Sequence, residues 1–339
     1  MYANKTVAAV IPAYNEEGFI GEVIRTLPEY IDRAYVIDDG STDGTWDEIT
    51  THADRVEPDG GTAIRSPGKS ASPTHRLPTP EVIPIQHQKN RGVGAAIKTG
   101  YHRALADEMD VTTVIAGDGQ TEPDIVERII KPVATDRADY SKGNRMLSRE
   151  GMPPLRQFGN FLLAVLTKIA SGYWKLNDPQ NGSTAISLSA LRAIDLDALY
   201  DGYGFANDLL VRLNVHGFTV IDVPRRAVYK DETSHIDFKT FVITVSWLLL
   251  RDFLWRLRTK YLQRDFHPLA LFYLGGAATS ATGLLGIFRD IRARNSVLTS
   301  NGTVLFVVGW FLMLFAMIFD MQENDELQEV GDYEPGDRV

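Results

Sequence analysis

A chain of 339 residues is long enough for one large core with an added membrane segment. It contains no cysteine, which excludes disulfide bonds, cysteine-ligated zinc sites and cysteine nucleophiles. The formal net charge of -9 argues against a nucleic-acid-binding protein, because such proteins normally carry a basic face.

Short apolar runs alternate with helical patterns over the first 120 residues. This alternation predicts a parallel α/β sheet with helices on both faces. The expected strands are Thr6–Ile11, Ala34–Ile37, Val82–Ile85 and Val111–Ala116, and the expected helices are Glu17–Leu27, one from Asp43, and Gly92–Leu105. Residues 57–81 are rich in Pro, Gly, Ser and Thr and lack an apolar period, so we expect a surface insertion there.

The segment after Gln120 continues the mixed pattern. Pro at a first helical position marks one helix start at Pro123. Two further helices are expected at Pro154–Ser171 and Phe205–His216, and strands near Ala138–Lys142, Asn181–Leu188 and Thr219–Val223. Together with the preceding part, these elements define a predicted catalytic domain of residues 1–235.

Two uncharged segments near the end of the chain have the length of membrane spans. His267–Phe288 and Val297–Phe319 each supply the roughly 20 apolar residues that a bilayer core requires. Several of their glycines would weaken a helix in water but suit close helix packing in lipid, among them Gly275, Gly276, Gly283, Gly286 and Gly309. We therefore expect a two-helix transmembrane hairpin at residues 265–321, followed by an acidic, disordered tail at 322–339.

Residues 236–264 combine Trp, Phe and Leu with several Arg and Lys. This composition is typical of an amphipathic helix in the membrane interface, and equally of a core-packed helix with a solvated basic face. The position just before a span favours the interface helix.

Two spans return the chain to the side on which it begins. The start of the sequence carries no signal-peptide pattern, and the basic residues before the first span favour the inside. Arg289, Arg292 and Arg294 in the short outer loop oppose that orientation. We expect a multi-pass protein of the cell membrane with a cytoplasmic catalytic domain.

Polar motifs follow each of the first four predicted strands. They are Pro12–Glu16, Asp38–Ser41, Asn90–Ala96 and Gly117–Gln120. Any one of them is explained by a turn, but ligands of open parallel sheets bind at the carboxyl ends of strands. Four such motifs at one edge predict a binding site.

The residue types at this edge suit a nucleotide diphosphate. Asp39 can accept hydrogen bonds from a base or ribose, and the glycines of Asn90–Ala96 allow close approach at a helix N-terminus that favours an anion. Asp118 and Gln120 offer hard oxygen ligands for Mg²⁺ or Mn²⁺. The P-loop lysine signature and the dinucleotide glycine pattern are both absent from the sequence.

These motifs resemble those of family 2 inverting glycosyltransferases, most nearly the dolichol-phosphate mannose and glucose synthases and their bacterial polyprenyl-phosphate relatives. The likeness covers about Thr6 to Leu262. It implies a GT-A fold, with a mixed, mostly parallel sheet and flanking helices, a nucleotide-diphosphate sugar donor and a divalent metal. It also implies that the nucleotide is bound by Pro12, Ala13, Tyr14, Glu16, Asp39 and Gly94, and that the metal is held by Asp118 and Gln120.

The acceptor side also resembles that family. Gly143–Arg145 and Arg156–Asn160 are similar to the segments that grip a lipid phosphate there. A phosphate monoester carries about −1.5 to −2 charges, and arginine forks neutralise and orient it. We expect Arg145, Arg156 and Asn160 to bind the acceptor phosphate, with Asp118, Arg145 and Arg156 as the catalytic group; a surface salt bridge is the alternative for a lone arginine.

Two lysines are further candidates. Lys230 lies where the family has a loop over the donor, and Lys142 is a weaker phosphate candidate.

Two positions depart from the family pattern. Ala116 replaces the first acid of the metal motif, and Ala206 stands where relatives often carry an acid before Asn207 and Asp208. An anionic acceptor oxygen has no proton to lose, so a general base is dispensable. Asp208 is a candidate cap for its helix.

The sequence thus predicts transfer of one hexose from UDP-glucose or GDP-mannose to dolichyl or another polyprenyl phosphate. A polysaccharide synthase is one alternative, although the chain lacks a Gln-x-x-Arg-Trp motif and has few spans. An inactive nucleotide-sugar-binding membrane protein is the other, supported by Ala116 and Ala206.

Overall fold

One mixed sheet organises the globular part of the protein. The computed structural model describes residues 1–56, 80–118, 123–144, 154–224, 238–293, 296 and 300–331. Within these residues the strand order is β3-β2-β1-β4-β6-β5-β7-β8. The strands are β1 (Val7–Ala13), β2 (Arg33–Asp38), β3 (Glu81–Gln86), β4 (Val111–Val114), β5 (Tyr140–Asn144), β6 (Thr184–Ser187), β7 (Val220–Pro224) and β8 (Gln328–Val330). Strand β6 runs antiparallel to β4 and β5, and the other pairs are parallel.

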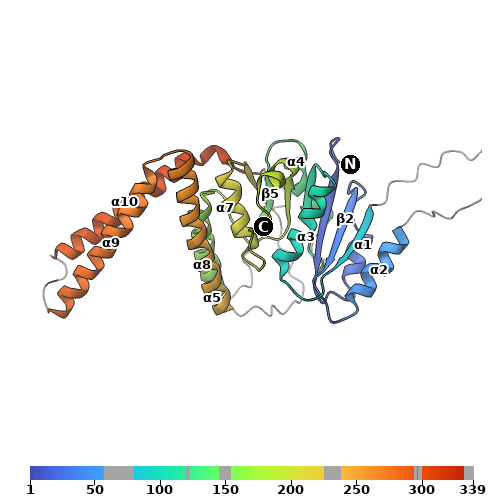
Figure 1. Ribbon diagram of the computed structural model, residues 1–339, viewed down its shortest axis with the longest axis horizontal. Coiled ribbons are helices and arrows are strands. Elements are labelled where there is room, and N and C mark those ends of the chain that lie inside the picture. Colours follow the sequence, from blue (N-terminus) through green and yellow to red (C-terminus); the bar gives the residue numbers. More distant parts are fainter. Residues whose placement is uncertain are drawn as a thin grey trace, which may run out of the picture.

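Helices cover both faces of this sheet (Figure 1). Alternate residues of β1 point to opposite faces, so Val7 and Ile11 join one core cluster and Val10 joins the other. The first cluster is closed by α1 (Ile20–Arg25), α2 (Thr45–Val56) and α4 (Pro123–Ala134). The second is closed by α3 (Val93–Ala106), α6 (Leu188–Ala193) and α7 (Phe205–Val215).

A helical extension lies beside the sheet domain. Helices α5 (Pro154–Ser171) and α8 (Phe238–Arg258) pack on each other and on α7, through a cluster that includes Leu163, Val211 and Leu249. A π-helical segment (Thr259–Arg264) then leads to α9 (Leu269–Arg292) and α10 (Asn301–Glu323). In Figure 1 this last pair extends away from the sheet domain as a separate arm.

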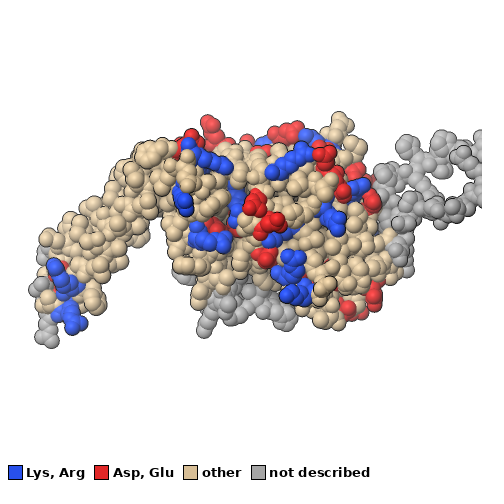
Figure 2. Space-filling model, in the orientation of Figure 1, with Lys and Arg blue, Asp and Glu red and all other residues tan. Residues whose placement is uncertain are grey.

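The α9–α10 hairpin presents its apolar side chains outward. The two helices have 24 and 23 residues, with mean hydropathies of 1.4 and 2.4, and only 22% and 17% of their most apolar windows are buried. Figure 2 shows that the arm is free of charge between its root and its tip, where α9 carries Arg289 and Arg292. Both helices are therefore long and apolar enough to cross a membrane, and their burial is too low for the core of a water-soluble globule.

Glycines allow the two helices of the hairpin to approach closely. A Cβ atom at Gly276 would lie 2.8 Å from the carbonyl oxygen of Gly309, and one at Gly302 would lie 2.6 Å from the nitrogen of Ile287. These contacts are backbone atoms of the opposite helix, as expected for small residues at a helix crossing in lipid. Gly275 differs, because nothing lies within 4 Å of a Cβ placed there.

Gly283→Ala is expected to destabilise the hairpin, whereas Gly275→Ala is not. A methyl group at residue 283 would meet the backbone nitrogen of Phe306 and lie 2.8 Å from the carbonyl oxygen of Gly302. Neither atom can move without separating the helices, and overpacking of this kind costs about 1–3 kcal/mol. Thermal unfolding in detergent should show a lower midpoint for Gly283→Ala and no loss for the matched Gly275→Ala control. Equal midpoints would contradict this account of the packing.

Helix α8 is amphipathic in an unexpected way. Its exposed residues include Ile243, Trp247, Leu250 and Leu254, and Arg251 and Arg258 are exposed beside them. Arg256, which we expected among the basic residues of an interface helix, is completely buried. The composition contained both kinds of residue but could not show which of them faces outward.

The tail prediction is wrong for residues 322–331. Helix α10 continues to Glu323, a 3-10 turn follows at Asp325–Leu327, and β8 pairs in parallel with β7. The backbone nitrogen of Gly331 also donates to the carbonyl oxygen of Asp222 at 2.8 Å. A three-residue strand has no detectable period, which is why its acidic surroundings suggested disorder; residues 332–339 lie outside the described chain.

Candidate functional site at the carboxyl edge of the sheet

The loops after β1 and β2 are joined to each other by hydrogen bonds. Asn15, in a left-handed conformation with φ 56°, donates its backbone N–H to the Ser41 hydroxyl at 2.9 Å. Its side-chain oxygen accepts the Thr42 N–H at 2.9 Å, and the backbone N–H of Glu16 donates to the Thr45 hydroxyl at 2.8 Å. The Asp39 N–H donates to the carbonyl oxygen of Ala13 at 2.9 Å. The first two motifs therefore form one surface, on which Tyr14 is exposed.

Asp39 joins this surface to the third motif. Its buried carboxylate accepts the backbone N–H groups of Arg91, at 3.0 Å, and of Gly92, at 2.8 Å. It also accepts a hydrogen bond from His87 Nδ1 at 2.6 Å, and His87 Nε2 contacts the Thr99 hydroxyl at 2.9 Å. Asp39 thus fixes the turn that leads into α3, in addition to any contact with a ligand.

The start of α3 is packed against a distant loop of the same chain. A Cβ atom at Gly94 would lie 2.5 Å from the carbonyl oxygen of Tyr200 and 2.7 Å from that of Asp201. The Ala95 N–H donates to the latter oxygen at 3.1 Å. We expected the glycines here to admit a ligand, and the structure shows that Gly94 admits the chain's own backbone.

Asp208 holds that distant loop in place. Its carboxylate accepts the Tyr200 N–H at 2.9 Å and the Arg212 Nε–H at 2.9 Å. Lys98 adds a second tie from α3, since its ammonium donates to the carbonyl oxygen of Leu199 at 2.9 Å. The prediction that Asp208 caps its own helix is therefore replaced by a tie to the preceding loop.

Asp118 lies beside the end of β1. A Cβ atom at Gly117 would lie 2.9 Å from the carbonyl oxygen of Pro12, so the absence of a side chain there brings the fourth motif against the first. Asp118 is partly buried, and Gln120 lies outside the described residues. Among the described residues no group of three or more His, Cys, Asp or Glu could hold a metal ion. A single carboxylate fits a Mg²⁺ or Mn²⁺ ion whose other ligands come from a diphosphate and water.

A buried charge pair underlies the start of the predicted acceptor segment. Lys142 in β5 and Asp222 in β7 have almost no exposed surface, and their charged groups are 2.6 Å apart. Asp222 also accepts from Asn144 Nδ2 at 2.8 Å and from the Asn177 N–H at 2.9 Å. Lys142 is thus a structural partner of Asp222, and burial lowers the pKa of the neighbouring Lys168, which donates to Asn177 Oδ1 at 3.1 Å.

The side chains of the acceptor candidates Arg145, Arg156 and Asn160 and of the donor candidate Lys230 lie outside what the structure describes. Arg145 and Lys230 belong to undescribed segments, and the side chains of Arg156 and Asn160 are not described, although their backbone forms the first turns of α5. Their roles stay predictions. The structure does bring together Pro12, Ala13, Tyr14, Glu16, Asp39, Gly94 and Asp118 at one sheet edge.

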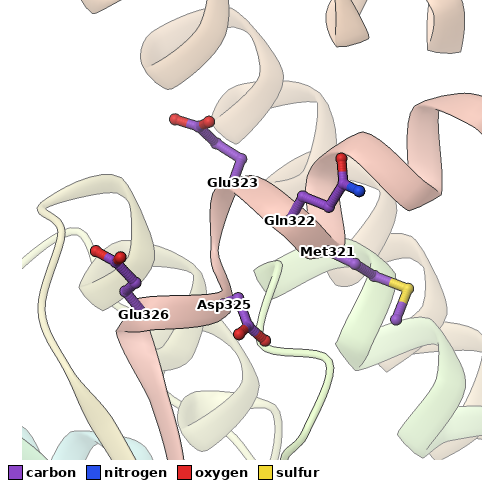
Figure 3. A pocket seen from close by; sticks show the side chains of 5 residues that line it. All are labelled: Met321, Gln322, Glu323, Asp325 and Glu326. Atoms are coloured by element: carbon purple, nitrogen blue, oxygen red, sulfur yellow. The ribbon is translucent and has the colours of Figure 1, made fainter.

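An open hollow of about 710 Å³ lies elsewhere, at the foot of the hairpin. It is lined by Met321, Gln322, Glu323, Asp325 and Glu326. Figure 3 shows that the acidic side chains diverge instead of converging on one point. Asp325 is bound to Lys175 at 2.7 Å. This hollow is remote in sequence from the four motifs and offers no convergent ligand set.

Comparison with known proteins decides the family. The model of the family described as Glycosyl transferase family 2 matches residues 8–194. The chain belongs to this family. The matched region contains the four motifs at the carboxyl edge and both predicted acceptor segments, so the glycosyltransferase activity predicted from the motifs is confirmed at the level of the family.

Two relatives of this family 2 glycosyltransferase have names that refer to dolichyl phosphate or to polyprenol. It is 28% identical over 233 residues, 68% of this chain and 88% of the relative, to UDP-N-acetylglucosamine–dolichyl-phosphate N-acetylglucosaminyltransferase of Methanococcus voltae. It is 28% identical over 229 residues, 63% of this chain and 74% of the relative, to polyprenol monophosphomannose synthase of Mycolicibacterium smegmatis.

A solved structure confirms the fold. Glucosyl-3-phosphoglycerate synthase from Mycobacterium tuberculosis, in complex with UDP, superimposes with a TM-score of 0.50 at 20% identity, covering 75% of this chain and 80% of that one. The GT-A-type mixed sheet with flanking helices predicted from the resemblance is therefore correct.

Sequence reasoning missed His87, Lys98 and Asp222. His87 follows β3 directly, as the four motifs follow their strands, and this position was a usable signal. Lys98 interrupts the apolar face of α3, and Asp222 interrupts a buried strand. A charge on such a face indicates a buried partner, but the sequence does not name that partner.

Proposed function

We propose that this family 2 glycosyltransferase moves one hexose, with inversion, from a nucleotide-diphosphate sugar to dolichyl or another polyprenyl phosphate. The main support for this proposal is that one chain combines two features. The sheet edge with the donor-site motifs and the outward-facing apolar hairpin are parts of one packed structure. UDP-glucose and GDP-mannose are the proposed donors, and the relative from Methanococcus voltae adds UDP-N-acetylglucosamine as a donor to test.

In the proposed reaction an oxygen of the lipid phosphate attacks the anomeric carbon. The bond from that carbon to the donor's diphosphate breaks, and the nucleotide diphosphate leaves with the electron pair. A bound Mg²⁺ or Mn²⁺, held by Asp118 and Gln120, would neutralise the diphosphate. Arg145, Arg156 and Asn160 orient the acceptor phosphate, so rate acceleration rests on proximity and electrostatics without a covalent enzyme intermediate.

We further propose that the site works at the cytoplasmic face of the cell membrane. The hairpin supplies two spans. The exposed apolar residues of α8 would lie in the headgroup region of the bilayer, between these spans and the sheet domain. Ile243 and Trp247 are 72% and 70% exposed, which is costly in water and favourable at a lipid surface. Helix α5, whose first turn carries Arg156, packs directly on α8.

A donor panel tests the proposal. Membranes containing the purified protein are incubated with polyprenyl phosphate, Mn²⁺ and each of UDP-glucose, GDP-mannose and UDP-N-acetylglucosamine. We expect one donor to yield a chloroform-extractable product whose mass equals the lipid phosphate plus one sugar residue. Calorimetric binding of a nucleotide sugar without any product from the panel would contradict the proposal and favour an inactive binding protein.

Arg156→Ala is expected to slow transfer by about 10- to 100-fold, because charge-assisted hydrogen bonds contribute roughly 1.5–3 kcal/mol. The effect should appear as a raised KM for the lipid phosphate, with donor binding unchanged. Arg192→Ala is the matched control, since its exposed pair with Glu108 should contribute little. A full rate in Arg156→Ala would remove this residue from the acceptor site.

A further inference from the structure

A completely buried ion pair joins the hairpin to α8, which packs on α5 and α7 of the globular part. Arg256 in α8 and Asp320 in α10 have no exposed surface. The guanidinium donates through Nη1 to Oδ1 at 2.9 Å and through Nη2 to Oδ2 at 2.8 Å. This two-pronged geometry fixes the orientation of both partners as well as their distance.

Groups from several elements complete the environment of this pair. The carbonyl oxygen of Ile169, near the end of α5, accepts from Arg256 Nη2 at 3.0 Å. The Tyr261 hydroxyl and Trp174 Nε1 donate to the Asp320 carboxylate at 2.8 and 3.3 Å. Asn324 Nδ2 donates to the same carboxylate at 3.0 Å. We call this set of residues the joint: Arg256, Asp320, Ile169, Tyr261, Trp174 and Asn324.

The segment after the joint is tied to the sheet as well. Gln328 begins β8, and its side-chain oxygen accepts the Lys175 N–H at 2.7 Å. Asn214 of α7 donates to Asn324 Oδ1 at 2.8 Å, and Lys260 donates to the same oxygen at 2.6 Å. The chain at the end of α10 is therefore tied to α7, to Lys175 and to the segment that precedes α9. Burial of the Lys260 ammonium, together with the charge of the neighbouring Arg256, lowers the pKa of Lys260 to about 8.

Gly172 gives the joint its space. It adopts a left-handed conformation with φ 79°, and a Cβ atom there would collide with Arg256 Nη1. A well-packed apolar pair of similar volume is often as stable as a buried ion pair, so stability alone does not account for this arrangement. What an ion pair adds is a single relative orientation of the two helices.

We propose that Arg256 and Asp320 are positioning residues that set the angle between the hairpin and the sheet domain, and so the height of the acceptor site above the bilayer. The inference rests on the proposed function. Helix α5 has 18 residues and is about 27 Å long. Its last turns contact the joint at Ile169, and its first turn carries Arg156. A swing of the hairpin would move that far end relative to a phosphate anchored in the membrane.

A comparison of a membrane-anchored acceptor with a water-dispersed one distinguishes the proposed positioning role from a merely structural role of the ion pair. We compare a long-chain polyprenyl phosphate in phospholipid vesicles with a short isoprenyl phosphate dispersed in water. In Asp320→Asn and in Arg256→Met/Asp320→Leu, vesicle transfer should fall at least about tenfold, while transfer to the short acceptor stays within about twofold and nucleotide-sugar binding is unchanged. The double variant leaves no buried charge unpaired, which protects the test against misfolding.

The outcomes against the proposal are equally specific. Transfer to both acceptors falling together, neither falling, or donor binding lost in both variants would each overturn it. The third result would place the pair in the folding of the sheet domain itself.

A distance measurement tests the joint independently of activity. The chain has no cysteine, so spin labels can be placed through Asp197→Cys and Leu285→Cys, both at exposed positions. The labelled parent should give a narrow distance distribution in nanodiscs, and the Asp320→Asn form a broader one. An unchanged distribution would overturn the proposal. If the parent were inactive on both acceptors but the Asp320→Asn form still gave the broader distribution, the proposed function would be rejected. The conclusion that Arg256 and Asp320 fix the orientation of the hairpin would still stand.

Discussion

Asp39→Asn is expected to lower kcat/KM for the nucleotide sugar by about 100-fold or more. The carboxylate accepts from His87, Arg91 and Gly92, and it is 3% exposed. An amide would keep one acceptor oxygen and turn an N–H₂ group toward these donors. Each charge-assisted hydrogen bond lost costs about 1.5–3 kcal/mol, so losing two accounts for this effect. The turn into α3 would then lose its fixed shape.

Steady-state kinetics of transfer measure this change, and calorimetry of donor binding shows how much of it lies in the affinity for the donor. His87→Gln should have a smaller effect, because a glutamine can still donate to Asp39. Asp197→Asn is the exposed control and should leave donor binding unaltered, since its partner His102 is also exposed. Should Asp39→Asn bind and turn over the donor like the parent, the turn would not depend on this carboxylate.

The predicted elements agree with the structure where one local period dominates. Helix α5 begins and ends at the residues predicted, Pro154 and Ser171. The expected strand Val82–Ile85 is observed as Glu81–Gln86. Strand β8 was missed because its pairing with β7 depends on a return of the chain from the hairpin, which no local pattern reveals.

The site was predictable as a place but not as a set of contacts. Strand ends in register brought the four motifs to one edge, as the sequence indicated. The partners of Asp39 depend on the register of β2 with β3, which pairs Asp38 with Gln86 and so sets His87 beside the next residue. Gly94 meets Tyr200 across more than 100 residues of chain, and only the folded packing shows this contact.

The burial of Arg256 illustrates the same limit. Six basic residues in the amphipathic region 236–264 predict a charged face, and one arginine that points inward does not change this composition. Its partner Asp320 is 64 residues away, at the end of a helix that composition identifies as a membrane span. Long-range ion pairs of this kind arise from topology, so they became visible only in the folded chain.

Asp222→Ala is expected to lower the free energy of unfolding by about 3–5 kcal/mol, the typical cost of leaving a buried charge without its partner. Lys142 is 1% exposed, and its remaining partners among the described residues would be the carbonyl oxygens of Gly143 and Asn177. Asn144 and the backbone of Asn177 would lose their acceptor as well. Because β5 leads directly into the predicted acceptor segment at Arg145, acceptor KM should rise together with the loss of stability.

Replacing both charges separates the pair from its surroundings. Lys142→Met/Asp222→Leu leaves no unpaired ammonium, but Asn144 and Asn177 still lose their acceptor, so its free energy of unfolding should lie below that of the parent and above that of Asp222→Ala. Lys175→Met is the matched surface control, because its pair with Asp325 is 42% and 62% exposed and should contribute less than about 1 kcal/mol. Denaturant unfolding in detergent, followed by tryptophan fluorescence, measures all three. If Asp222→Ala unfolded like the surface control, the ammonium would have found another partner, and the buried pair would not be what holds β5 against β7.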